Sequence, residues 1–121
     1  MRVLYVDDEP DIREIARLAL SLDAGIEVET AGSGAEAVWR AGEWRPDIIL
    51  LDVMMPEMDG PTTLAALRAD AQTANIPVVF ITARTQAQEV ETFKRLGAVS
   101  VIPKPFDPMA LAAQVRSLGG A

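Results

Sequence analysis

Short apolar runs alternate along the chain with longer stretches in which apolar residues recur every three or four positions. Each run holds four or five mostly apolar residues, which is typical of strands in a parallel sheet, where both faces are buried. The predicted strands span residues 3–6, 26–30, 48–51, 78–82 and 99–102. In the second run Glu27 and Glu29 alternate with less polar residues, which indicates an edge strand with one face in water.

The stretches between and after these runs predict five amphipathic helices, each with an apolar stripe facing the sheet. The predicted stripes are Ile12, Ile15, Ala16, Ala19 and Leu22; Ala35, Val38 and Ala41; Leu64 and Leu67; Val90, Phe93 and Leu96; and Leu111, Ala112, Val115 and Leu118. Pro10 suits a first helical turn, Asp59 and Asp107 are predicted N-caps, and residues 33–36 and 85–88 are predicted capping boxes.

Five strands alternating with five helices predict an α/β fold, in which helices cover both faces of an open parallel sheet. The chain has 121 residues, and half of them are hydrophobic, which suits one compact domain. Residues 1–121 are therefore expected to form a single unit without a linker or an internal repeat.

Polar residues stand where four of these strands end. They are Asp7 and Asp8, Asp52, Thr82, and Lys104. Each has an ordinary explanation alone, such as a helix cap for an aspartate or a solvated loop charge for the lysine. The carboxyl ends of parallel strands meet at one edge, so their coincidence favours a shared site. Asp52 follows a fully apolar strand, so its carboxylate needs a cation, a hydrogen-bond donor or a proton beside it.

Composition removes many alternative chemistries. The chain contains no cysteine and no histidine, which excludes disulfides, thiolate nucleophiles, zinc–thiolate sites and imidazole bases. A formal charge of −7 argues against direct binding of nucleic acid. No apolar run is long enough for a signal peptide or a membrane span, so no membrane contact and a cytoplasmic location are expected.

Four motifs together resemble the receiver domain of response regulators, the phosphoryl-accepting partner of sensor histidine kinases in two-component signalling. They are Asp7-Asp8, residues 52–60 (Asp-Val-Met-Met-Pro-Glu-Met-Asp-Gly), Thr82-Ala83, and Lys104-Pro105-Phe106. The resemblance covers essentially the whole chain and implies strand order 2-1-3-4-5 with five flanking helices. The sequence stops after the fifth predicted helix, so a chemotaxis-type, single-domain regulator at residues 1–121 with no output domain is expected, the alternative being a fragment of a longer regulator.

By this resemblance, Asp52 accepts the phosphoryl group. Three carboxylates around one point repel one another and an incoming phosphoryl donor, so a divalent cation is expected. Mg²⁺ fits best because it prefers hard oxygen ligands, and Mn²⁺ is the alternative. The implied metal ligands are Asp7, Asp8, Asp52 and the backbone carbonyl of Met54. The implied phosphoryl contacts are Lys104, the Thr82 hydroxyl and the Ala83 backbone N–H.

The resemblance also implies partners. A sensor histidine kinase or a histidine phosphotransfer protein is expected to dock near Ile12, Ile15 and Ala16. Phosphorylation would change the surface of the fourth helix, fifth strand and fifth helix, where a downstream protein target binds. The protein is expected to be a switch that assists only its own phosphorylation and autodephosphorylation, not an enzyme, and to be a monomer or a phosphorylation-dependent dimer.

Three residues depart from common family patterns. The family often has an aromatic residue at the position of Val101, so a switch through an aromatic rotamer is not expected here. Met54 and Arg84 stand two residues after Asp52 and Thr82, at the rim where hydrolytic water enters. We hypothesise that neither side chain positions that water, so that the phosphorylated state is long-lived. In family members the peptide before the proline that matches Pro105 is cis.

Three rival functions share the topology or the residues. A flavodoxin-like electron carrier would need a loop rich in glycine and hydroxyls after the first strand, where this chain has Asp-Asp-Glu-Pro. A phosphohydrolase with an aspartate nucleophile would need a second acid where Met54 stands. A phosphorylation-independent scaffold is the strongest alternative, although it would not need the acids, the hydroxyl and the lysine together.

Overall fold

The computed structural model describes residues 1–119 and contains a sheet of five parallel strands. The strands are β1 (Arg2–Val6), β2 (Glu27–Ala31), β3 (Ile48–Asp52), β4 (Val78–Thr82) and β5 (Ser100–Pro103). They lie in the order β2-β1-β3-β4-β5, with β2 at one edge. This order and the parallel pairing of all neighbours confirm the predicted fold.

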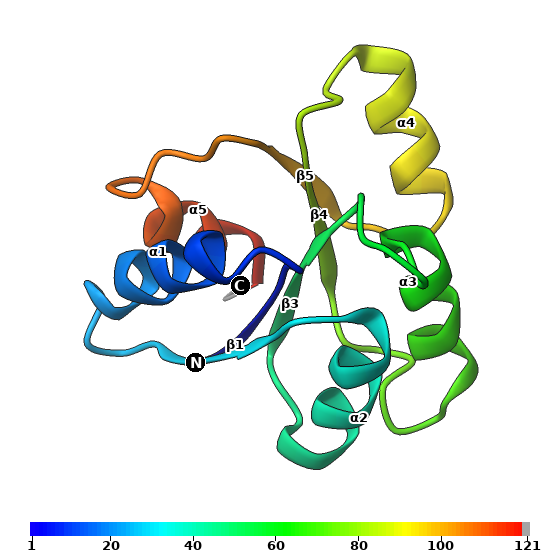
Figure 1. Ribbon diagram of the computed structural model, residues 1–121, viewed down its shortest axis with the longest axis horizontal. Helices are drawn as coiled ribbons and strands as arrows, with labels where there is room; N and C mark the ends of the chain where they lie inside the picture. The colour runs from blue at the N-terminus through cyan, green and yellow to red at the C-terminus, as the bar shows by residue number, and fades with distance from the viewer. Residues whose placement is uncertain (120–121) are drawn as a thin grey trace.

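Helices cover both faces of the sheet, so the molecule has three layers (Figure 1). Helices α1 and α5 lie on one face, and α2, α3 and α4 lie on the other. Their bounds are α1 (Pro10–Ser21), α2 (Gly34–Trp44), α3 (Gly60–Ala69), α4 (Ala87–Arg95) and α5 (Leu111–Gly119). Successive strand residues point to opposite faces, so Leu50 packs beneath α1 and α5 while Leu51 packs beneath the other three helices. Every residue of β3 and β4 is buried, and a fully buried aliphatic side chain contributes roughly 1.5–3 kcal/mol.

The core face of α1 differs in part from the predicted one. The predicted residues Ala16 and Ala19 are buried, and so is Leu20, whereas Ile15 and Leu22 are 44% and 66% exposed. This helix carries two apolar stripes at helical spacing, and periodicity alone does not say which stripe faces the sheet. The small side chains of the alanines allow the helix to lie close to the sheet. The other two predicted stripe residues found exposed are Ala35 and Leu96.

Helix starts follow local capping chemistry in part. The Ser33 hydroxyl accepts a hydrogen bond from the Glu36 N–H at 3.1 Å, and Asp59 accepts one from the Thr62 N–H at 2.9 Å, as predicted. The prediction of a capping box at residues 85–88 is wrong, because α4 begins after Gln86 without a side-chain cap. The Asp107 carboxylate accepts from the Met109 N–H at 2.9 Å in a turn that precedes α5, so it does not cap that helix directly.

The helices are short compared with a lipid bilayer. The longest, α1, has 12 residues, whereas a transmembrane helix needs about 20. Within residues 1–119, no helix has both the length and the apolar character that crossing a membrane requires.

Candidate functional site

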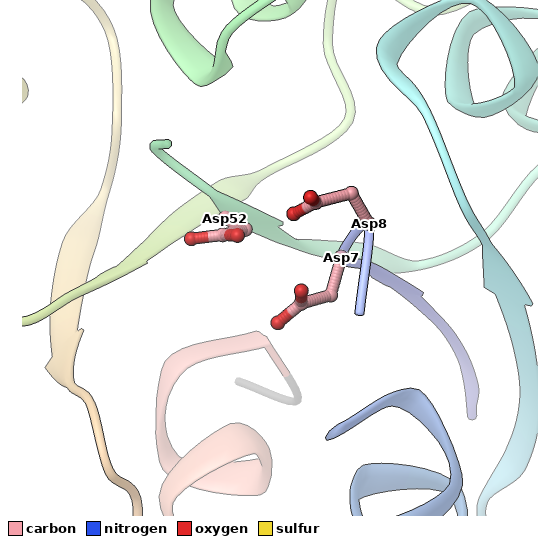
Figure 2. A group of neighbouring side chains, drawn as sticks. All are labelled: Asp7, Asp8 and Asp52. Atoms are coloured by element: carbon pink, nitrogen blue, oxygen red, sulfur yellow. The ribbon is translucent and has the colours of Figure 1, made fainter. Parts of the chain in front are cut away.

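The strand register brings three acids together. Val6 at the end of β1 pairs with Leu51 of β3, so the residues that follow, Asp7 and Asp52, lie side by side. Carboxylate oxygens of Asp7, Asp8 and Asp52 lie within 4.8 Å of one another. Figure 2 shows the three side chains gathered at the ends of β1 and β3. The sheet order therefore creates the acidic cluster predicted from the strand ends.

Lys104 supplies the cation that this cluster needs. Its Nζ lies 2.9 Å from Asp7 Oδ2, 3.5 Å from Asp52 Oδ2 and 3.7 Å from Glu9 Oε1. Its backbone N–H donates to the Thr82 carbonyl at 2.9 Å, which fixes the end of β5 against β4. The peptide between Lys104 and Pro105 is cis, as in the family members that the sequence resembles.

The environment of Asp52 favours the uncharged carboxyl. Burial, and then the negative charge of Asp7, raise the pKa of Asp52 from 3.8 to about 6, although Lys104 opposes this rise. Burial also disfavours the charged form of Lys104, yet its hydrogen bond to Asp7 and the surrounding acids raise the pKa of that lysine. One ammonium group thus faces several carboxylates, and the site retains an excess of negative charge. Such a site attracts a further cation.

Within the acidic cluster, Asp7 accepts the most hydrogen bonds. Its carboxylate is fully buried and accepts from the Tyr5 hydroxyl at 3.2 Å, from Lys104 Nζ at 2.9 Å and from the Glu9 N–H at 3.0 Å. The Arg13 guanidinium donates to the Asp7 backbone carbonyl at 2.7 Å. These contacts fix both the main chain and the side chain where β1 ends.

The loop after β3 is shaped by close backbone packing. The Gly60 N–H donates to the Val53 carbonyl at 2.9 Å, and a Cβ atom at Gly60 would lie only 2.8 Å from the Asp52 carbonyl oxygen. Glu57 has a left-handed backbone with φ of 66°. This turn returns the chain to the edge of the site and leaves the Met54 side chain 66% exposed.

The hydroxyl of Thr82 lies at the end of β4, next to β3. It is buried and accepts a hydrogen bond from the Arg84 N–H at 3.0 Å, which leaves its own proton free for an acceptor. An Arg84 guanidinium nitrogen lies 3.9 Å from the carboxylate of Glu89 in α4. Both predicted rim residues line one cavity of about 390 Å³, together with Val53, Gln88, Glu89, Thr92 and Phe93.

Comparison with known protein families decides what kind of site this is. A family model described as the response regulator receiver domain matches residues 3–116. The chain belongs to this family. A receiver domain is the signalling switch of two-component response regulators, and the acidic cluster lies in this domain.

Relatives and solved structures support the same assignment. The chain is 38% identical over 117 residues to the "DNA-binding dual master transcriptional regulator RpaA" of Synechocystis and 37% identical over 116 residues to the "DNA-binding response regulator MtrA" of Mycolicibacterium smegmatis. These matches cover 97% and 96% of the chain but 48% and 49% of the relatives, so the chain spans about half their length. The chemotaxis protein CheY4 of Vibrio cholerae superposes with a TM-score of 0.88 at 37% identity, over 97% of both chains.

Sequence reasoning missed three residues that contact this receiver site. The apolar pattern predicts Tyr5 only as a strand residue, although strand alternation places it on the same side as Asp7. Glu9 approaches Lys104 from the start of α1, and Arg13 follows one helical turn later. The spacing of these residues from Asp7 was the available signal. Val101, which stands at the switch position where the family often has an aromatic residue, is partly buried against the core beneath α2, α3 and α4.

Proposed function

We propose that Asp52 of this receiver domain accepts a phosphoryl group from a phosphohistidine on a sensor histidine kinase or a histidine phosphotransfer protein. The observation that carries the proposal is the position of its carboxylate, 3% exposed at the end of β3 and 3.5 Å from the Lys104 ammonium, beside two further acids. Burial disfavours the free carboxylate, so Asp52 gains by sharing its charge with a new partner.

The donor set fits a hard divalent cation. Carboxylate oxygens of Asp7, Asp8 and Asp52 approach one another closely enough to share an ion, and oxygen ligands suit Mg²⁺, with Mn²⁺ as a substitute. The backbone carbonyl of Met54 would complete the set of protein ligands. When bound, the ion would offset the negative charge of the acids and of the phosphoryl group.

In the proposed reaction, an Asp52 carboxylate oxygen forms a bond to phosphorus as the phosphorus–nitrogen bond of the phosphohistidine breaks. The electron pair of the broken bond stays on the imidazole nitrogen. Lys104 then holds one phosphoryl oxygen, and the Thr82 hydroxyl and the Ala83 N–H hold others. The Thr82 proton is available for this contact because its oxygen already accepts from the Arg84 N–H.

The energy of these contacts is sufficient to drive a conformational switch. Hydrogen bonds to charged groups contribute about 1.5–3 kcal/mol each. Inverting a 1:99 equilibrium requires about 5.5 kcal/mol, which three such bonds of average strength supply and two approach. Because Thr82 ends β4 and Lys104 directly follows β5, the proposed change spreads to the surface of α4, β5 and α5, beside the partly buried Val101. A downstream protein would bind there.

In this proposal, residues 1–121 form one receiver domain. The domain works as a switch and not as an enzyme that acts on other substrates. It would assist only the transfer to Asp52 and the later hydrolysis of the acyl phosphate. Its output would pass through protein contacts or a phosphorylation-dependent dimer, with no direct binding of nucleic acid by this acidic domain. A net charge of −7 supports this division of labour, because DNA is also negatively charged.

The proposal is tested by incubating the protein with acetyl phosphate, with and without Mg²⁺, and measuring its intact mass. The expected result is a gain of one phosphoryl group that requires Mg²⁺ and is lost in Asp52→Ala. Asp11→Ala is the matched control, because this aspartate is exposed on α1 and is expected to leave uptake unchanged. If the parent protein takes up no phosphoryl group, a phosphorylation-independent scaffold becomes the better explanation.

A further inference from the structure

The single tyrosine of the chain links the hydrophobic core to the acidic site. Tyr5 lies in the middle of β1 and is fully buried, and its ring packs edge-on against Phe106 with a centroid distance of 6.1 Å. A buried hydroxyl requires a hydrogen-bond partner, and that partner is Asp7 Oδ2 at 3.2 Å. Tyr5 in β1 and Asp7 directly after that strand are two residues apart, and their side chains point to the same side of the sheet.

One carboxylate oxygen of Asp7 accepts hydrogen bonds from both Tyr5 and Lys104. Oδ2 accepts from the Tyr5 hydroxyl and from Lys104 Nζ at 2.9 Å, whereas Oδ1 accepts from the Glu9 N–H. The two donors differ in mobility. The Tyr5 ring is held within the core on all sides, while Lys104 carries its ammonium on a flexible four-carbon chain.

We infer that Tyr5 is a positioning residue that keeps Asp7 hydrogen-bonded when Lys104 leaves it for the phosphoryl group on Asp52. This inference rests on the proposed function. A buried carboxylate oxygen that loses its partner is costly, and that cost opposes the departure of the lysine. The fixed hydroxyl lowers the cost, because Oδ2 keeps one donor throughout.

The hydrogen bond between Tyr5 and Asp7 also allows a prediction for a variant that lacks the tyrosine hydroxyl. In Tyr5→Phe the ring still packs against Phe106, but Lys104 becomes the only side-chain donor to Oδ2 among the described residues. The lysine should then be held on Asp7 more firmly and reach the phosphoryl group less readily. Loss of one hydrogen bond to a charged group corresponds to about a tenfold lower rate of phosphorylation.

If Tyr5 is a positioning residue, the effect of Tyr5→Phe on the phosphorylation rate should depend on Lys104. An effect of Tyr5 on packing alone would not depend on the lysine. We would measure the rate of phosphorylation by acetyl phosphate and Mg²⁺ in the parent, Tyr5→Phe, Lys104→Met and the double variant. Tyr5→Phe should slow the parent about tenfold but should change the Lys104→Met protein by less than about twofold. Equal slowing in both backgrounds would overturn the inference, since a packing defect does not depend on the lysine.

A second measurement follows the environment of Tyr5 directly. Because the chain has one tyrosine, 3-fluorotyrosine labelling gives a fluorine NMR signal from this position alone. The signal should shift when the parent protein is phosphorylated and stay fixed in Asp52→Ala under the same conditions. A phosphorylated parent with an unchanged signal would refute the role of Tyr5 but leave the proposed function intact. A parent that takes up no phosphoryl group would overturn both.

Discussion

Asp52→Asn is expected to stabilise the folded protein at neutral pH in the absence of divalent cations. The pKa of this carboxyl is raised from 3.8 to about 6, so the folded chain binds the proton more tightly than the unfolded chain does. Stability therefore falls as the pH rises from about 4 to 6, and above pH 6 the charged carboxyl carries its full penalty. The difference between the two pKa values corresponds to about 3 kcal/mol.

Asparagine removes this penalty, in which the opposing attraction of Lys104 at 3.5 Å is already included. A gain of about 3 kcal/mol in the free energy of unfolding is expected at pH 7.5, shrinking to less than about 1 kcal/mol near pH 4. Urea denaturation with EDTA at both pH values measures the gain. The control is Asp11→Asn, whose carboxylate is exposed. A variant no more stable than the parent at pH 7.5, or equally stabilised at both pH values, would refute the reasoning.

Three further predictions concern the rest of the site. Mg²⁺ at ten times Kd should stabilise the folded parent by about 1.4 kcal/mol through preferential binding to the folded state. Calorimetry should therefore find a higher melting temperature with Mg²⁺ in the parent and no such rise in Asp8→Asn. Met54→Asn and Arg84→Ala should lose phosphate faster than the parent in a mass-spectrometric time course; decay no faster than the parent's contradicts the proposed role of the rim. Gly60→Ala should destabilise the fold by about 2 kcal/mol or more in urea, because its Cβ would lie 2.8 Å from Asp52 and Val53 backbone atoms; an unchanged midpoint would show that the loop moves freely.

The strands and the edge of the sheet where they end could be predicted from the sequence, because each strand is indicated by a short local run of apolar residues. Apolar runs fix the strands, and once the strands are parallel, the residues at their carboxyl ends must share one edge. That is why the sequence alone predicts Asp7, Asp52 and Lys104 at one edge of the sheet. The pairings confirm this placement, since β1 and β3 are neighbours and Lys104 reaches Asp7 and Asp52 from β5.

Other features depend on contacts between distant residues. The inward face of α1 is decided by how closely Ala16 and Ala19 approach the sheet, whereas Ile15 satisfies the same helical spacing and is exposed. Tyr5 could not be recognised as part of the site, because within an apolar strand its ring explains its position completely. Only the folded arrangement brings its hydroxyl to the carboxylate that Lys104 also contacts.

The central claim is that Asp52 carries the phosphoryl group, and the most direct measurement is chemical identification of the modified residue. Borohydride reduces an aspartyl phosphate to homoserine, and peptide mapping by tandem mass spectrometry then locates it. After treatment with acetyl phosphate and Mg²⁺, homoserine is predicted at position 52 and nowhere else. Homoserine at Asp7, Asp8 or Asp59, or at no position, would contradict the account.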